Sequence, residues 1–128
     1  MKALETNTTL HSLHIGGNNI DQESFLQISL YLRNNSTLVA LNLSDTSIGE
    51  LDVEHFSQSL RLNSSLTYLS LSRTNMGDSG LNWISKALKE NNTLKIVDLH
   101  INFIGLPGIT KLSKVLKKNT SLQSLSLR

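Results

Sequence analysis

A spacing of 28 residues governs this sequence along its whole length. Leucine recurs at that interval five times, and each of these leucines opens a block of the form Leu-x-x-Leu-x-Leu, with Ile or Val as an occasional substitute. Self-similarity at such a period is typical of a solenoid of stacked units. The recurring leucines are Leu10, Leu38, Leu66, Leu94 and Leu122, and an asparagine stands three residues before each of them, at Asn7, Asn35, Asn63, Asn91 and Asn119.

Each unit has two halves with different hydrophobic periods. The leucine block alternates apolar and polar residues at its end, as in Leu69 and Leu71, which predicts a short strand. The second half repeats its apolar residues at helical spacing, which predicts one amphipathic helix per unit. The helical sets are Phe25, Ile28 and Leu32; Val53, Phe56 and Leu60; Leu81, Ile84 and Leu88; and Ile109, Leu112 and Leu116.

One unit cannot bury its own apolar faces, so successive units must stack. Identical connections make the strands parallel neighbours in one sheet. Strands lie about 4.8 Å apart, whereas packed helices need about 8–10 Å, so the helices take the longer, outer arc. The predicted fold class is therefore α/β: a curved solenoid with a parallel β-sheet on the concave face and α-helices on the convex face.

Blocks such as NSSLTYLSLSRTNMGDSGLNWISKALKE (63–90) resemble leucine-rich repeats of the ribonuclease-inhibitor type. The resemblance covers residues 1–128 as a single solenoid of about four full repeats plus a fifth strand. It implies an asparagine or cysteine in the loop after each strand, and Asn18 and Asn102 match. Thr46 and Thr74 replace it in the middle units, where we expect part of the same bonding and slightly looser loops.

Both ends of the chain carry ordinary repeat sequence. Residues 2–4 match the helical segment 86–88, and residues 125–128 match a strand. Solenoids need polar capping units, and neither end resembles one. We therefore expect a fragment of a longer array, with additional repeats or another domain covering the ends.

Asp98 and His100 stand at alternate strand positions and raise the question of catalysis. A dyad would still need a nucleophile and a pocket, and an open concave sheet offers no evident pocket. We interpret both residues as surface side chains and expect no enzyme activity. The four histidines do not meet in the predicted fold, so we expect no metal site, and without a phosphate-binding motif we expect no cofactor.

Composition narrows the partners. The chain has no cysteine, which excludes disulfides and thiolate metal sites. It also has no segment near the roughly 20 apolar residues that cross a bilayer and no signal-peptide pattern, so we expect a cytoplasmic protein without membrane contact. Residues 65–128 hold nine Lys and Arg against three Asp and Glu, but only Trp83 is an aromatic neighbour of the basic helices. We therefore expect no nucleic-acid binding.

Seven Asn-x-Ser/Thr triplets occur, at Asn7, Asn34, Asn35, Asn42, Asn63, Asn91 and Asn119. Most of them are copies of one repeat position between a helix and the next strand. Asparagine tolerates the left-handed conformation that ends helices. We therefore interpret the triplets as structural and not as glycosylation sites.

Surface side chains that the repeat does not require are the best functional candidates. They gather on the concave face of the third and fourth units, and aromatic and arginine residues among them are enriched at binding hot spots. Trp83, on a helix, is a second candidate, either as an exposed anchor or packed on the neighbouring helix. The predicted partner-binding residues are Tyr68, Ser70, Arg73, Ile96, Asp98, His100 and Ile101.

The resemblance implies a non-enzymatic scaffold that binds a protein partner, as in the repeat regions of ribonuclease inhibitor and innate immune sensors. The alternative is a regulator of a small GTPase, by analogy with GTPase-activating repeat proteins. No motif in the chain matches those proteins and supports assigning their function to this chain. GTP hydrolysis by small GTPases with and without the chain would distinguish the two.

Overall fold

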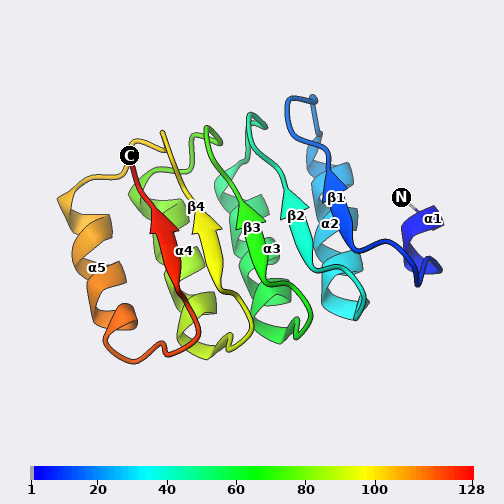
Figure 1. Ribbon diagram of the computed structural model, residues 1–128. Coiled ribbons are helices and arrows are strands. Elements are labelled where there is room, and N and C mark those ends of the chain that lie inside the picture. The colour runs from blue at the N-terminus through cyan, green and yellow to red at the C-terminus, as the bar shows by residue number, and fades with distance from the viewer. Residues whose placement is uncertain (1) are drawn as a thin grey trace.

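Each 28-residue unit forms one strand and one helix in the computed structural model, which describes residues 2–128, with side chains from Leu4 onward (Figure 1). The strands are β1 (Ser12–His14), β2 (Ala40–Asn42), β3 (Tyr68–Ser70), β4 (Ile96–Asp98) and β5 (Ser124–Ser126). The helices are α1 (Lys2–Glu5), α2 (Gln22–Asn34), α3 (Glu50–Leu62), α4 (Gly77–Glu90) and α5 (Leu106–Leu116). Pro107 lies in the first turn of α5, where its missing N–H costs little.

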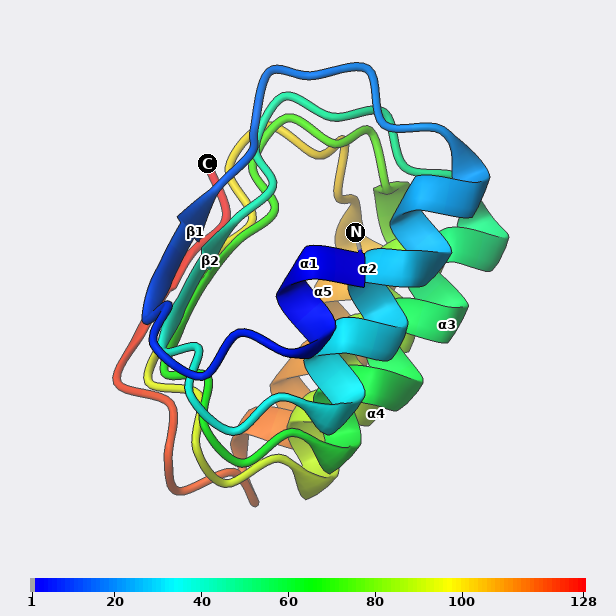
Figure 2. The same cartoon turned by 90° about the vertical axis from the view of Figure 1, so that its right-hand side faces the viewer.

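The strands form one parallel sheet in the order β1-β2-β3-β4-β5, and every pair keeps the 28-residue register, as in Leu41 opposite Leu69. Viewed along the array, the sheet is one layer and the helices are the other, with loops joining them at both edges (Figure 2). The strands line the concave face and the helices the convex face. The predicted α/β solenoid is confirmed. No helix within residues 2–128 is long and apolar enough to cross a membrane.

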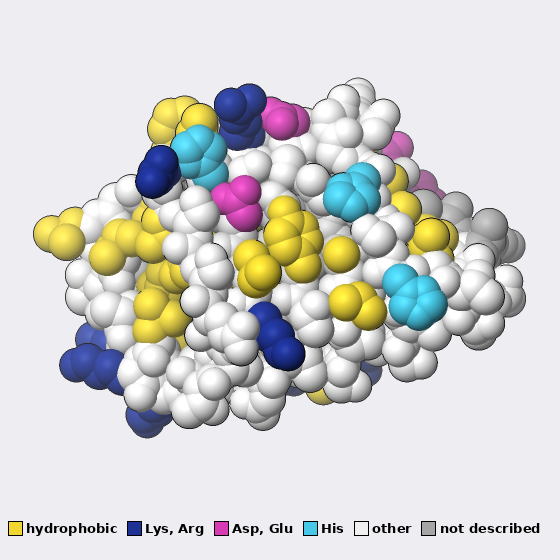
Figure 3. Space-filling view, in the orientation of Figure 1, with side chains coloured by type: hydrophobic (Ala, Val, Ile, Leu, Met, Phe, Trp, Pro, Cys, Tyr) yellow, Lys and Arg dark blue, Asp and Glu magenta, His cyan; other side chains and the backbone are white. Residues whose placement is uncertain are grey.

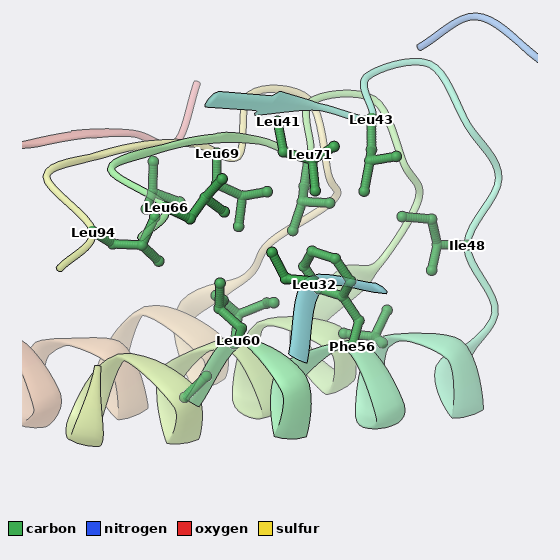
Figure 4. Close-up of a cluster of buried hydrophobic side chains, with 14 of the residues drawn as sticks. Leu32, Leu41, Leu43, Ile48, Phe56, Leu60, Leu66, Leu69, Leu71 and Leu94 are labelled. Carbon is green, nitrogen blue, oxygen red and sulfur yellow. The ribbon is translucent and has the colours of Figure 1, made fainter. Parts of the chain in front are cut away.

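The core lies between the two layers and is almost wholly aliphatic (Figure 4). Strand leucines such as Leu69 and helix residues such as Leu60 are 0% exposed. Phe25, Tyr31 and Phe56 are its aromatic members, and the ring centroids of Phe25 and Phe56, from adjacent helices, lie 5.6 Å apart. The core-facing residues of the central units follow the two periods that the sequence predicts.

The last helix departs from its predicted stripe. Leu32, Leu60 and Leu88 are fully buried, but Leu116 in the same repeat position is 39% exposed. Within the described residues α5 packs on α4 alone, so it has a neighbouring helix on one side only. Val115 packs against the core there.

In the third, fourth and fifth units the recurring asparagine joins its unit to the one before it. Asn91 is 2% exposed. Its Nδ2 donates to the carbonyl oxygens of Leu60 and Asn63, at 2.8 and 3.1 Å. Its Oδ1 accepts the backbone N–H groups of Thr93 and Leu94, at 3.0 and 2.9 Å. The same four bonds recur at Asn63 and at Asn119.

The backbone angles of these asparagines correct the expectation of a left-handed conformation, and their hydrogen bonds support a structural role. The asparagines are not left-handed: φ is −83° at Asn35, −72° at Asn63 and −74° at Asn91, all in extended backbone. The position needs an amide side chain because one group must both donate to two carbonyls and accept from two N–H groups. At Asn63, Asn91 and Asn119 the amide is therefore a structural element, as predicted for this repeat position.

The loops after the strands use a second set of buried polar side chains. Thr46 and Thr74 are 1% and 0% exposed, and each hydroxyl donates to the carbonyl three residues earlier. The part of the asparagine bonding predicted for threonine is therefore present. Asn102 makes the fuller set: Nδ2 donates to the carbonyls of Leu71 and Leu99, and Oδ1 accepts from the backbone N–H of Thr74.

Asn102 therefore holds the loop of the third unit as well as its own. In Asn102→Thr, the residue that the second and third units use, we expect the unit-to-unit bonds to be lost and the free energy of unfolding to fall by about 1–3 kcal/mol. Urea denaturation followed by circular dichroism would measure this. Thr46→Asn, the reverse exchange, is the matched control, and an equal loss in both variants would contradict the assignment.

Candidate functional site

An apolar patch occupies the middle of the concave face (Figure 3). Tyr68 and Ile96 are register partners on β3 and β4, and Ala40 lies opposite Tyr68 on β2. Ile96 is 42% exposed, and Val39 just before β2 is 40% exposed. Ser12 and Ser124 hold the same repeat position on the outer strands, so the fold itself does not require apolar side chains here.

Ser70 is a correction to the predicted contact surface. Its side chain points to the same face, but the residue is only 2% exposed. Its hydroxyl lies 2.7 Å from the Ser44 hydroxyl and donates to Oδ2 of Asp98 at 3.5 Å. Neighbours on both adjacent strands cover it. Ser70 therefore supports Asp98 and offers little surface to a partner.

Asp98 and His100 are half-buried on β4 and the loop that follows it. Asp98 Oδ1 accepts the backbone N–H of His100 at 3.0 Å, and Oδ2 faces Ser70. The carboxylate thus bonds to a backbone N–H and a hydroxyl, and its hydrogen bonds do not include the imidazole. This arrangement fixes the turn after β4.

Arg73 and Ile101 lie at the edge of the concave face, in the turns after β3 and β4. Both are exposed, and Arg73 forms an ion pair with Asp45 at 3.7 Å. Both also have left-handed backbone, in a column that shares this conformation: φ is 73° at Gly17, 58° at Asp45, 55° at Arg73 and 52° at Ile101. A β-branched residue such as isoleucine adopts this conformation only rarely.

On the convex side Trp83 is half-buried and packs against the core, so it is not a fully exposed anchor. Nζ of Lys86 lies 3.7 Å from the centroid of the indole ring, a cation–π contact. Arg61 and Glu90 pair across α3 and α4 at 3.7 Å. A shallow groove between these helices is lined by these four side chains among others.

A family model described as a leucine-rich repeat matches residues 6–24, 34–55 and 62–82. These segments are successive copies of the repeat seen in the structure. The chain is a leucine-rich repeat protein. The search of curated proteins found no significant match.

Solved structures share this leucine-rich repeat fold. The structure titled Leiomodin-1 Actin-Binding Site 2 superposes with a TM-score of 0.89 at 23% identity, covering 99% of this chain and 74% of that one. The tropomodulin C-terminal domain of Caenorhabditis elegans gives a TM-score of 0.55 at 14% identity, covering 92% and 89%. At these identities the likeness shows the fold alone.

Within residues 2–128 no three His, Asp or Glu side chains lie close enough to hold a metal ion. Two groups of the first unit have shifted pKa values. Hydrogen bonds from the side chain and backbone of Ser24 lower the pKa of Asp21, the N-cap of α2, and burial raises the pKa of Tyr31.

Two exposed apolar residues were not predicted from the sequence as candidates for partner binding. Phe103, in the loop between β4 and α5, and Leu106, the first residue of α5, are each 78% exposed. Both residues differ in character from the residues at the same repeat position in the other units. Position 103 corresponds to Asn19, Ser47 and Asn75, and position 106 to Gln22, Glu50 and Asp78.

Proposed function

We propose that the chain is a non-enzymatic protein–protein interaction scaffold that binds its partner on the concave face of the third and fourth units. One observation carries the proposal: the half-buried Tyr68 and the exposed Ile96 form an apolar pair on the surface of the sheet where the fold also accepts Ser12 and Ser124. Exposed aromatic and aliphatic side chains that the core does not use are characteristic of interaction sites.

Charged side chains around this pair add specificity. Lys95 is exposed next to Ile96 at one end of β4, and the half-buried Asp98 lies at the other end. Arg73 stands at the edge beyond it, paired with Asp45. A rim of charges around an apolar centre is the usual anatomy of a protein interface.

Actin is the first partner to test, because the leiomodin-1 structure is named as an actin-binding site. Its 23% identity to this chain supports a shared scaffold and leaves the partner open.

We also propose the ribonuclease-inhibitor type for these repeats, since α2, α3 and α4 are full helices of 13, 13 and 14 residues. The cytoplasmic location and the longer parent array stay predictions.

Partner binding can be tested by exchanging the pair for the residue that the outer strands carry. In Tyr68→Ser with Ile96→Ser, we expect affinity for the concave-face partner to fall by at least about 30-fold, because loss of two hot-spot side chains typically costs 2 kcal/mol or more. Immobilised wild-type and variant chains would be compared by quantitative capture from cell extract. Titration of purified actin would follow as the first defined ligand.

Trp83→Gln is the matched control, since Gln27 holds the same position on α2. This variant replaces a large aromatic side chain on the convex face, opposite the proposed site, and should leave the capture of the partner unchanged. Circular dichroism should show that all three proteins are folded. A partner retained by the Tyr68/Ile96 variant, or lost by Trp83→Gln, would contradict the concave-face assignment. No observation on the described residues favours the alternative function, the regulation of a small GTPase.

A further inference from the structure

The loop after β4 and the first residue of α5 carry apolar side chains at positions where no other unit has them. Ile101, Phe103 and Leu106 are 42%, 78% and 78% exposed. We call these three residues the rim cluster. The corresponding residues of the other units are all polar or glycine: Gly17, Asp45 and Arg73; Asn19, Ser47 and Asn75; Gln22, Glu50 and Asp78. Three neighbouring columns thus change character together in one unit.

The backbone makes this change costly to the fold. Ile101 and Phe103 both have left-handed φ, 52° and 54°. In the preceding unit Asn75, with φ of 65°, takes the position of Phe103, and asparagine is among the residues that best tolerate this conformation. Strained positions cluster where function requires a particular side chain. Phe103 and Leu106, each 78% exposed, therefore gain little free energy from burial, and the left-handed backbone of Ile101 and Phe103 costs conformational energy.

A shallow groove adjoins the cluster. It is lined by Asp45, Ser47, Arg73, Asn75, Ile101 and Phe103, and therefore spans the turns of three successive units. One wall is apolar and the other supplies hydrogen-bonding and charged groups. This shape suits a short protein segment lying across the loops. A flat anionic lipid surface fits less well because Asp45 would face its headgroups.

The cationic residues next to the groove select the sign of that segment: Arg73 lines the groove, and the backbone N–H of Ile101 donates to the carbonyl of Arg128. From Leu99 to Arg128 the chain has five Lys and Arg and no Asp or Glu. The nearest carboxylates are already engaged: Asp45 pairs with Arg73 at 3.7 Å, and Asp78 Oδ1 accepts the N–H of Gly105 at 2.7 Å. A second copy of this chain would bring the same positive charge to the contact.

We propose that the rim cluster is a second docking site, distinct from the Tyr68/Ile96 pair, for a short acidic protein segment that inserts apolar side chains beside Phe103. Its carboxylates face the positive charge of the last unit. Its apolar residues cover Ile101, Phe103 and Leu106. The site accordingly extends partner recognition from the concave face onto the loop edge of the solenoid.

A random 16-residue peptide library displayed on phage is the probe. It would be selected on the wild-type chain, and the recovered peptides titrated by fluorescence anisotropy. We expect Asp and Glu together with Leu, Phe or Trp to be enriched, and affinity to fall at least about tenfold in Phe103→Asn with Leu106→Gln. Those replacements come from the same columns, Asn75 and Gln22. The Tyr68→Ser/Ile96→Ser variant should bind these peptides like wild type.

Thermal unfolding separates a docking role from a structural one. The Phe103→Asn/Leu106→Gln variant should melt at the wild-type temperature or above it, because asparagine relieves the left-handed strain. A lower melting temperature would overturn the proposal. So would failure to recover peptides, recovery of basic peptides, or equal affinity for both proteins. If the wild-type chain bound phosphatidylserine vesicles and the variant did not, the occupant of the rim cluster would be a membrane and not a protein segment. If the wild-type chain self-associated in sedimentation and the variant did not, the occupant would be a second copy of the chain.

Discussion

Replacing Asn91 with alanine is expected to lower the free energy of unfolding by about 3–5 kcal/mol. The amide joins the third and fourth units through two donated and two accepted hydrogen bonds, and the residue is 2% exposed. Alanine would leave two carbonyls and two N–H groups without these partners in the interior. Each buried unsatisfied group costs about 1–3 kcal/mol, partly offset where water enters. Urea denaturation followed by circular dichroism would give the value.

Asn34→Ala is the control for this experiment. Asn34 is exposed and ends α2, one residue before the recurring asparagine of the second unit. Surface substitutions of this kind usually change stability by less than about 0.5 kcal/mol. Similar losses in the two variants would show that the interior amide does not hold the units together.

Replacing Phe56 with alanine is expected to cost about 3–5 kcal/mol as well. Phe56 is 1% exposed and stands in α3, which has a helix packed on each side. Its ring meets that of Phe25 at 53°, so alanine would remove both aliphatic and aromatic contacts. Backbone hydrogen bonds fix the strands and helices around it, which limits collapse of the cavity. The loss should appear in the urea midpoint with little change in slope.

Phe56→Ile tests whether the cost comes from the cavity. Isoleucine is the residue at Ile28 and Ile84, the same position on the adjacent helices. It refills most of the space, so we expect a loss below about 2 kcal/mol. An alanine variant no less stable than the isoleucine variant would rule out a packing role for the ring.

The fold could be predicted almost completely, because a constant period fixes register as well as element type. Leu69 must pair with Leu41 once every connection has the same length, and the structure shows that pairing. The role of Asn91 was harder to predict. A column of asparagines is compatible with left-handed helix ends and with buried bridges between units. Backbone angles, which the sequence does not contain, decide between them.

The candidate site was predicted less well, for two physical reasons. Ser70 belongs to an outward-facing column, but its exposure depends on the neighbours Ser44 and Asp98, which the column pattern does not weigh. Phe103 lies in a loop, where no hydrophobic period applies, and Leu106 is the first residue of α5, ahead of the apolar stripe of that helix. Comparing the loops column by column would have revealed them, since the other units have polar residues there.

The bridging asparagines have a consequence for how such a chain can change over generations. The joint between the second and third units uses the same backbone atoms as the joint between the third and fourth, 28 residues apart. A duplication or loss of one whole unit therefore creates no new kind of joint. It shifts the displayed side chains along the array by one strand spacing, about 4.8 Å. Recombination can thereby rearrange the surface of this protein while each joint between units stays the same.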